Sequence, residues 1–181
     1  MTMAKGLTAG YVPMGALMLS EKVYAGIADG APAGAPIGHG ATYSAHPVSA
    51  AVALEVLRLY EEGGILANGQ RGAAHFGAGL DALLAHPLVG DARHRGLLGA
   101  IELVSDKASK RGFDPALGLP DRIFAAGYEN GLVFRSFGDH VLGFAPALTY
   151  TASEFEQLFA RLRKTLDSVL AAADVRKALA D

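Results

Sequence analysis

The chain has 181 residues, of which 51% are hydrophobic and 19% are charged, and it contains no cysteine. This composition predicts a folded protein with a buried core, and it excludes disulfides and thiolate metal sites. The net charge of −2 gives no reason to expect a nucleic-acid partner. No apolar run approaches the roughly 18 to 20 residues that a membrane helix needs, and no charged leader precedes an apolar block, so we expect a cytoplasmic protein.

The first third of the chain is poor in charge. Residues 1–60 hold only six of the charged side chains, while the rest of the chain holds 28. A free-standing segment needs a wetted face, so this composition indicates a surface that other protein covers. We expect that cover to be a partner subunit, chain that lies outside this sequence, or both. The abrupt start at Met-Thr-Met-Ala supports the second of these.

The elements of this first third are short. The pattern predicts the end of a strand at 1–4, a turn-rich loop from Lys5, a short strand, and a helix that starts near Ser20, whose hydroxyl can cap it. Residues 26–46 contain glycine and proline throughout and are predicted to be loop.

Two helices are predicted next. The first starts at Pro47, a favoured first helical residue, and its apolar residues lie nearly all round, which predicts a buried helix. Gly63 and Gly64 interrupt it, and a second helical stretch runs to about His86.

The remainder predicts a small α+β unit, a short antiparallel sheet with helices on one side. Its predicted elements are a strand in 95–106, a helix in 119–131, strands in 132–137 and 140–148, and a helix over 151–170. The two later strands are joined at Gly138-Asp139, which is a hairpin signal. Thr151 and Glu154 have the spacing of a capping box.

Lys5 is the first candidate site residue, because no other charge occurs before Glu21. A lysine becomes a nucleophile where its surroundings favour the free amine. The neighbouring Gly6 and Gly10 permit close backbone approach to a ligand. The alternative is a lysine near a chain end that points into water, and the pattern alone leaves both open.

The second candidate is the segment GHGATYSAHP at 38–47. Glycines before a hydroxyl-rich run and a helix start can hold an anion through backbone N–H groups and a hydroxyl. The alternative is an ordinary glycine-rich loop with a capping serine. His39 and His46 have no carboxylate at ligand spacing, so we expect no metal site.

Arg135 is the third candidate. Strand alternation puts it on one face with Val133 and Phe137. An arginine keeps its charge, so it needs a carboxylate or phosphate partner or must reach water. Binding of an anionic group and a solvated strand-edge position are both compatible with this pattern.

Three segments taken together resemble the class III aminotransferases. They are TMAKGLTAGYVPMGA at 2–16, HGATYSAHPVSAAVAL at 39–54, and GLVFRS at 131–136 ahead of APAL. These are pyridoxal 5'-phosphate enzymes of fold type I, and the chain is most similar to the ω-amino acid:pyruvate group. The resemblance implies an α/β fold with the end of the large cofactor-binding domain at 1–60. A connecting helix at 61–87 and a small C-terminal α+β domain with a short antiparallel sheet at 88–181 would follow.

The resemblance also implies site residues and a reaction. In the family, the lysine of the A-K-G-L motif forms an imine with the cofactor and then shuttles the substrate proton, a role that falls on Lys5. A threonine from the neighbouring subunit binds the cofactor phosphate, which implies Thr42, and Arg135 matches an arginine that engages the substrate carboxylate. The implied enzyme moves an amino group between an amine or ω-amino acid and a keto acid such as pyruvate, as a homodimer or homotetramer.

The chain also departs from the family pattern. The earlier part of family chains, with the phosphate loop, the ring-stacking aromatic and the aspartate of a D-E-V motif, is absent here, and Ala41 stands where many relatives have an aromatic residue. We therefore expect the C-terminal part of an aminotransferase, inactive by itself. Two alternatives stay open: another reaction on the same cofactor, as in an aminomutase, decarboxylase or racemase, and a non-catalytic truncated subunit.

Overall fold

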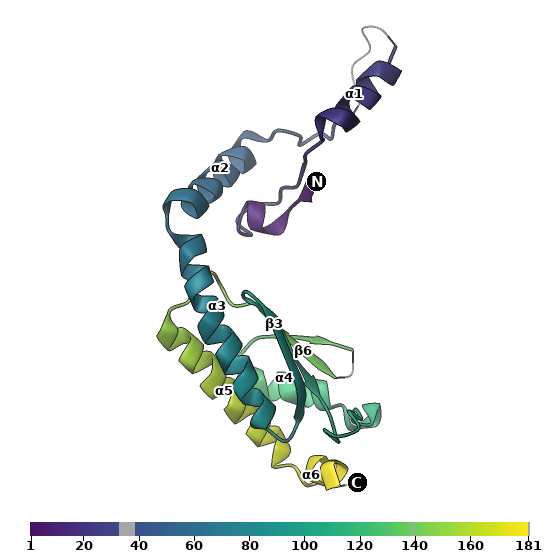
Figure 1. Ribbon diagram of the computed structural model, residues 1–181, viewed down its shortest axis with the longest axis vertical. Coiled ribbons are helices and arrows are strands. Elements are labelled where there is room, and N and C mark those ends of the chain that lie inside the picture. The colour runs from purple at the N-terminus through teal and green to yellow at the C-terminus, as the bar shows by residue number, and fades with distance from the viewer. Residues whose placement is uncertain (33–38, 139, 181) are drawn as a thin grey trace. The chain divides into compact units, whose positions relative to one another are not determined.

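The computed structural model describes residues 1–32, 39–138 and 140–180. The chain divides into two compact units, Met1–Gly64 and Ile65–Asp181, and Figure 1 labels their α-helices and the strands β3 and β6. Among the described residues, no helix combines the length and the apolar character needed to cross a membrane.

The first unit is built from short elements and two helices. Strand β1 (Thr2–Met3) pairs antiparallel with β2 (Ala16–Leu17), and the 3-10 turn η1 (Lys5–Leu7) lies between them. Helix α1 (Glu21–Gly30) begins at Ser20, whose Oγ accepts a hydrogen bond from the backbone N–H of Val23 at 3.4 Å. Helix α2 (Pro47–Glu62) ends at Gly63. The predicted short strand, the Ser20 cap and the helix start at Pro47 are confirmed.

Two expectations for this unit are wrong. Residues 26–30 are helical rather than loop, because the Ser20 cap and the alanines of α1 outweigh glycines that each cost about 1 kcal/mol. Helix α2 is not buried in this chain: it buries only Ala53 and Val56, and Leu54 is 69% exposed. Residues 33–38 of the predicted loop lie outside the described residues.

The second unit is a four-stranded antiparallel sheet with helices. Its strands are β3 (Val89–Arg95), β4 (Leu98–Leu103), β5 (Arg135–Phe137) and β6 (Val141–Phe144), in the order β3-β4-β6-β5. Its helices are α3 (Ile65–Ala82), η2 (Leu83–Ala85), η3 (Pro115–Leu117), α4 (Leu119–Glu129), α5 (Ala152–Leu170) and α6 (Ala173–Ala180). The predicted small α+β unit with a short antiparallel sheet is confirmed. Asp139, in the predicted hairpin, lies outside the described residues.

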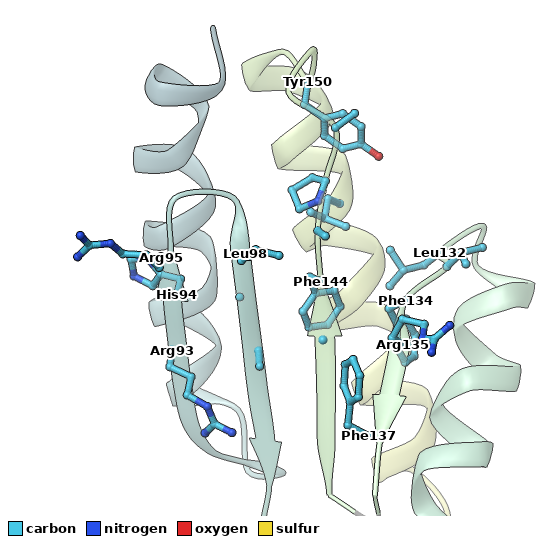
Figure 2. Close-up of a pocket in the computed structure, with 18 of the residues that line it drawn as sticks. Arg93, His94, Arg95, Leu98, Leu132, Phe134, Arg135, Phe137, Phe144 and Tyr150 are labelled. Carbon is cyan, nitrogen blue, oxygen red and sulfur yellow. The ribbon is translucent and has the colours of Figure 1, made fainter. Parts of the chain in front are cut away.

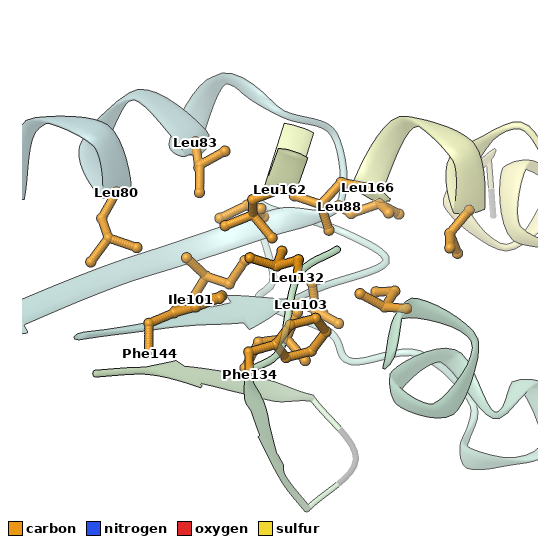
Figure 3. Close-up of a cluster of buried hydrophobic side chains, with 14 of the residues drawn as sticks. Leu80, Leu83, Leu88, Ile101, Leu103, Leu132, Phe134, Phe144, Leu162 and Leu166 are labelled. Atoms are coloured by element: carbon orange, nitrogen blue, oxygen red, sulfur yellow. The ribbon is translucent and has the colours of Figure 1, made fainter. Parts of the chain in front are cut away.

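One face of this sheet packs on helices to form the core of the unit. Figure 3 shows apolar side chains of the strands, such as Leu103 and Phe144, gathered with leucines of α3 and α5. Ile101 and Leu103 point inward from β4, while Leu162 and Leu166 point inward from α5. Each buried side chain of this size contributes about 1.5–3 kcal/mol. This unit therefore has a core of its own.

Helix α5 starts at the predicted capping box. The backbone N–H of Thr151 donates to Glu154 Oε2 at 2.7 Å, and the backbone N–H of Glu154 donates to Thr151 Oγ1 at 3.4 Å. The hydrogen bond from the Thr151 backbone lowers the pKa of Glu154. This reciprocal pair satisfies two N–H groups that a helix start otherwise leaves unpaired.

The opposite face of the sheet is open within this unit. Alternation along β4 turns Leu98, Ala100 and Glu102 away from the core, and Arg135 and Phe137 share that face on β5. Leu98 and Phe137 are both exposed. The open face therefore carries apolar and charged side chains together.

Candidate functional site

Lys5 lies in a loop that folds back on itself. Its backbone φ is 53°, in the left-handed region, which costs about 1–2 kcal/mol for a residue other than glycine. The backbone N–H of Thr8 donates to the Lys5 carbonyl at 3.2 Å. The side chain of Lys5 is exposed, and within the described ranges no hydrogen bond or ion pair engages its amine. The loop therefore fixes the backbone of Lys5 and leaves Nζ open to a ligand.

A side chain of helix α2 forms a hydrogen bond with this loop. Tyr60 Oη donates a hydrogen bond of 2.9 Å to the carbonyl of Gly6, across 54 residues of sequence. Tyr60 lies four residues after Val56, on the helix face that is buried. Thr8, only 2% exposed, donates from Oγ1 to the Val12 carbonyl at 2.7 Å. The sequence motifs do not single out Tyr60, although its spacing from Ala53 and Val56 places it on the same face of the helix.

Thr42 lies in a tight turn just before α2. The Ser44 hydroxyl accepts from the backbone N–H of Ala41, and the backbone N–H of Ser44 donates to the Ala41 carbonyl, both at 2.9 Å. Thr42 is exposed, and Ala45 closes the turn with a φ of 58°. The described side chains provide no cap for the first N–H groups of α2, since His46 makes no capping hydrogen bond. The turn thus presents a hydroxyl beside a helix start whose donors are open.

Lys5 and Thr42 lie toward opposite ends of α2. Thr42 precedes Pro47 at the start of the helix, while the Lys5 loop is held at Tyr60 in its last turns. About 20 Å of helix separates Pro47 from Tyr60 at 1.5 Å per residue. Arg135 belongs to the other unit.

Arg135 lines a groove of about 960 Å³ in the second unit (Figure 2). All four strands contribute to its lining, together with segments before β5 and after β6. The lining is mostly apolar, from residues such as Leu98, Phe144 and Pro146. Val133 and Arg135 are exposed while Leu132 and Phe134 are buried, which fits the predicted alternation that puts Val133 and Arg135 on one face.

A second arginine, Arg93, lines the same groove from β3 but is already neutralised. It donates to Glu102 at 3.0 Å and to Asp91, and these hydrogen bonds raise its pKa. Arg135 has no carboxylate partner in the part of the chain that the structure describes, and its guanidinium lies near the ring of Phe137. Of these two arginines, Arg135 is the one whose charge an anionic ligand can use.

The described residues contain no group of three or more histidines and carboxylates that would suit a metal ion. The groups available to a ligand are instead the amine of Lys5 and the hydroxyl of Thr42 in the first unit, and the guanidinium of Arg135 in the second unit.

Comparison with known proteins gives a family model and relatives. The model for aminotransferase class-III matches residues 1–166. An uncharacterized aminotransferase, y4uB, of Sinorhizobium fredii is 41% identical over 172 residues, covering 93% of this chain and 37% of the relative. A putrescine–pyruvate aminotransferase of Pseudomonas aeruginosa is 37% identical over 95% of this chain and 37% of its own length.

Solved structures agree with these relatives. An (S)-enantioselective ω-transaminase from Thermomicrobium roseum superposes with a TM-score of 0.85 at 36% identity, over 93% of this chain and 37% of that one. The mixed helix and sheet architecture, with its small antiparallel sheets, is thus that of a fold type I transaminase, as the sequence predicts. The chain spans 37% of the length of the relatives named here. The chain belongs to the class III aminotransferases, a family that depends on pyridoxal 5'-phosphate.

Proposed function

We propose that this chain forms the C-terminal part of a transaminase that moves an amino group between an amine or ω-amino acid and a keto acid such as pyruvate. The observation that carries the proposal is Lys5, a lysine with an open amine in a hydrogen-bonded loop, inside the segment that the family model matches. The relative named for putrescine and pyruvate supports this substrate pair. Because the relatives are much longer, the proposal includes that the 181 residues alone are inactive.

The same proposal assigns residues 1–60 to the end of a large cofactor-binding domain, 61–87 to a connecting helix and 88–181 to a small C-terminal domain. The division of the chain into units at Gly64 supports a boundary in this region. A cytoplasmic location is also proposed, on the composition given above.

Lys5 supplies the reactive amine. When bound, pyridoxal 5'-phosphate supplies an aldehyde that an amine can attack and a ring that takes up electrons from the substrate carbon. The Nζ of Lys5 would hold the cofactor through that aldehyde, and once free it would take up and return the proton at the substrate carbon. Tyr60 and the loop hydrogen bonds keep the Lys5 backbone in place through both steps.

Thr42 and the start of α2 suit the cofactor phosphate. A helix N-terminus attracts anions, and the first turn of α2 contains no acidic residue to compete. The Thr42 hydroxyl adds a donor beside it. Because Lys5 and Thr42 lie toward opposite ends of α2, the proposal takes them from two chains, so that the enzyme is a homodimer or a larger oligomer.

Arg135 is proposed to bind the substrate carboxylate. Its guanidinium fits a carboxylate through two hydrogen bonds, and no carboxylate of the described residues occupies it. When the amine donor has no carboxylate, the guanidinium of Arg135 has to move away from the position that a carboxylate would take. The long side chain of Arg135, three residues before Gly138, can occupy two positions.

The proposal is tested with Arg135→Ala in a complete class III aminotransferase that carries this segment. Loss of hydrogen bonds to a charged group costs about 1.5–3 kcal/mol, so the KM for pyruvate should rise by about tenfold or more. Turnover of a simple aryl-alkyl amine in the donor half-reaction should stay within about twofold. Arg95→Ala, an exposed arginine at the same groove, is the matched control and should change neither half-reaction. An equal fall in both half-reactions with Arg135→Ala would show that this residue is structural.

A further inference from the structure

We infer that Phe137, seated over Gly143, is a resting platform for the guanidinium of Arg135, and that it thereby sets the balance between substrates with and without a carboxylate. This inference rests on the proposed role of Arg135. Phe137 acts through Arg135 and is a positioning residue.

The strand register brings the three residues together on the open face. Arg135 lies opposite Gly143, and Phe137 lies opposite Val141, so Phe137 and Gly143 are diagonal neighbours across β5 and β6. Figure 2 shows Arg135 and Phe137 from β5 side by side at the edge of the groove. The Cζ of Arg135 lies 6.0 Å from the centre of the Phe137 ring, at the range of a cation–π contact.

Gly143 makes this arrangement possible. A Cβ added at Gly143 would lie 2.5 Å from Cε2 of Phe137, a separation that real Cβ atoms essentially never show. The ring therefore occupies the space that any other residue at 143 would fill. Phe137 remains 55% exposed, so its ring is not held there by burial in the core.

The two arginines on this face, Arg93 and Arg135, differ in their partners. Arg93, across the sheet in the same row, is held by Glu102 and Asp91 and has no need of an aromatic partner. Arg135 forms no side-chain hydrogen bond or ion pair with the described residues, and its guanidinium lies near the Phe137 ring. A cation–π contact at an exposed site is weak, so a substrate carboxylate can outcompete it. A weak resting contact is what allows Arg135 to leave for a carboxylate and return for an uncharged group.

A purely structural role for Phe137 makes a different prediction. An aromatic ring that covers a glycine on a neighbouring strand also stabilises the strand pair. Loss of such a role would weaken both half-reactions alike. Loss of the platform instead releases Arg135 toward the carboxylate position and favours only the keto acid.

The experiment uses Phe137→Leu in a complete, cofactor-loaded enzyme that carries this segment. We expect the KM for pyruvate to fall about two- to fivefold, the KM for a simple aryl-alkyl amine not to fall, and kcat to hold. Gly143→Ala, which pushes the ring away, should act in the same direction. The matched control is Phe124→Leu, a phenylalanine of the same unit that is 45% exposed and packs against Phe134.

A second readout needs no turnover. In the isotope-labelled 181-residue chain, the Nε–Hε resonance of Arg135 should move with Phe137→Leu and stay in place with Phe124→Leu. A KM for pyruvate that is unchanged or raised in Phe137→Leu overturns this inference, and so does an unmoved resonance. If Arg135→Ala also leaves the KM for pyruvate unchanged, the proposed carboxylate role has failed as well, which separates the two failures.

Discussion

The two units of this chain differ in what holds them together. The second unit packs twenty buried apolar residues from its strands and helices into one cluster. Among the described residues of the first unit, only Thr8, Ala53 and Val56 are buried, and apolar side chains of β2, α1 and α2 are exposed. The first unit carries the exposed Lys5, while the second unit carries the exposed Arg135.

This difference indicates how each unit positions its candidate site residues. A core gives the second unit rigidity, so its arginine can be placed by strand register. The first unit relies on hydrogen bonds such as that from Tyr60 to Gly6, and its exposed apolar residues favour cover from further protein. We therefore expect the positions of Lys5 and Thr42 to depend on an assembly more than that of Arg135 does.

The largest expected effect tests the core directly. Leu162→Ala should lower the free energy of unfolding by about 2–5 kcal/mol, because the side chain is fully buried. Leu54→Ala, at 69% exposure in α2, is the matched control and should change it by less than about 0.5 kcal/mol. Urea unfolding of the 181-residue chain measures both. Equal costs at the two positions would contradict the contrast between the units.

The next effect sharpens the role of the first unit. Thr42→Ala in a complete enzyme would remove the proposed hydrogen bond to the cofactor phosphate, and loss of one hydrogen bond to a charged group costs about 1.5–3 kcal/mol. Cofactor affinity, measured by equilibrium dialysis, should therefore fall more than roughly tenfold. Thr149→Ala, an exposed threonine of the second unit, should leave it unchanged. Unchanged affinity in Thr42→Ala would favour an ordinary glycine-rich loop.

Much of the fold follows from local signals in the sequence. Helix α5 was predictable because a capping box precedes a regular apolar stripe, and both signals act within one helix. Strand β3 was not, since Val-Gly-Asp-Ala-Arg-His-Arg lacks alternation of apolar and polar residues. Its pairing with β4 is what defines it. The exposure of α2 was not predicted, because apolar residues indicate that a helix can be buried but do not show which part of the protein covers it.

The site divides in the same way. Lys5, Thr42 and Arg135 were named from the sequence because short motifs carry them. Tyr60, Phe137 as a partner of Arg135, and the neutralised Arg93 depend on contacts between segments far apart or on strand register. Such contacts leave no local pattern in a single sequence.

The smallest expected effect is a pH dependence in the second unit. Burial lowers the pKa of His86 below its usual 6.5, although the hydrogen bond with Asp167 opposes this. The neutral ring also accepts the backbone N–H of Leu88 at Nδ1, a contact that protonation breaks. Because the folded chain binds this proton less readily than the unfolded chain, the stabilisation is complete above about pH 6.5 and is lost as the pH falls through the lowered pKa.

Urea unfolding at a series of pH values checks this expectation. His86→Gln should flatten the decline below pH 6.5 relative to the unmodified chain, while His39→Gln, at an exposed position in the first unit, should not. A decline of the same size in both variants would assign it to other groups.

The central claim is that Lys5 is the amine that holds the cofactor. It is tested most directly by loading a complete enzyme that carries this segment with pyridoxal 5'-phosphate, reducing it with borohydride, and mapping the modified peptide. We expect the label on the peptide that contains Lys5, no label on Lys22, the other lysine of the first unit, and no turnover in Lys5→Ala. Label on a different lysine, with Lys5→Ala still active, would contradict it.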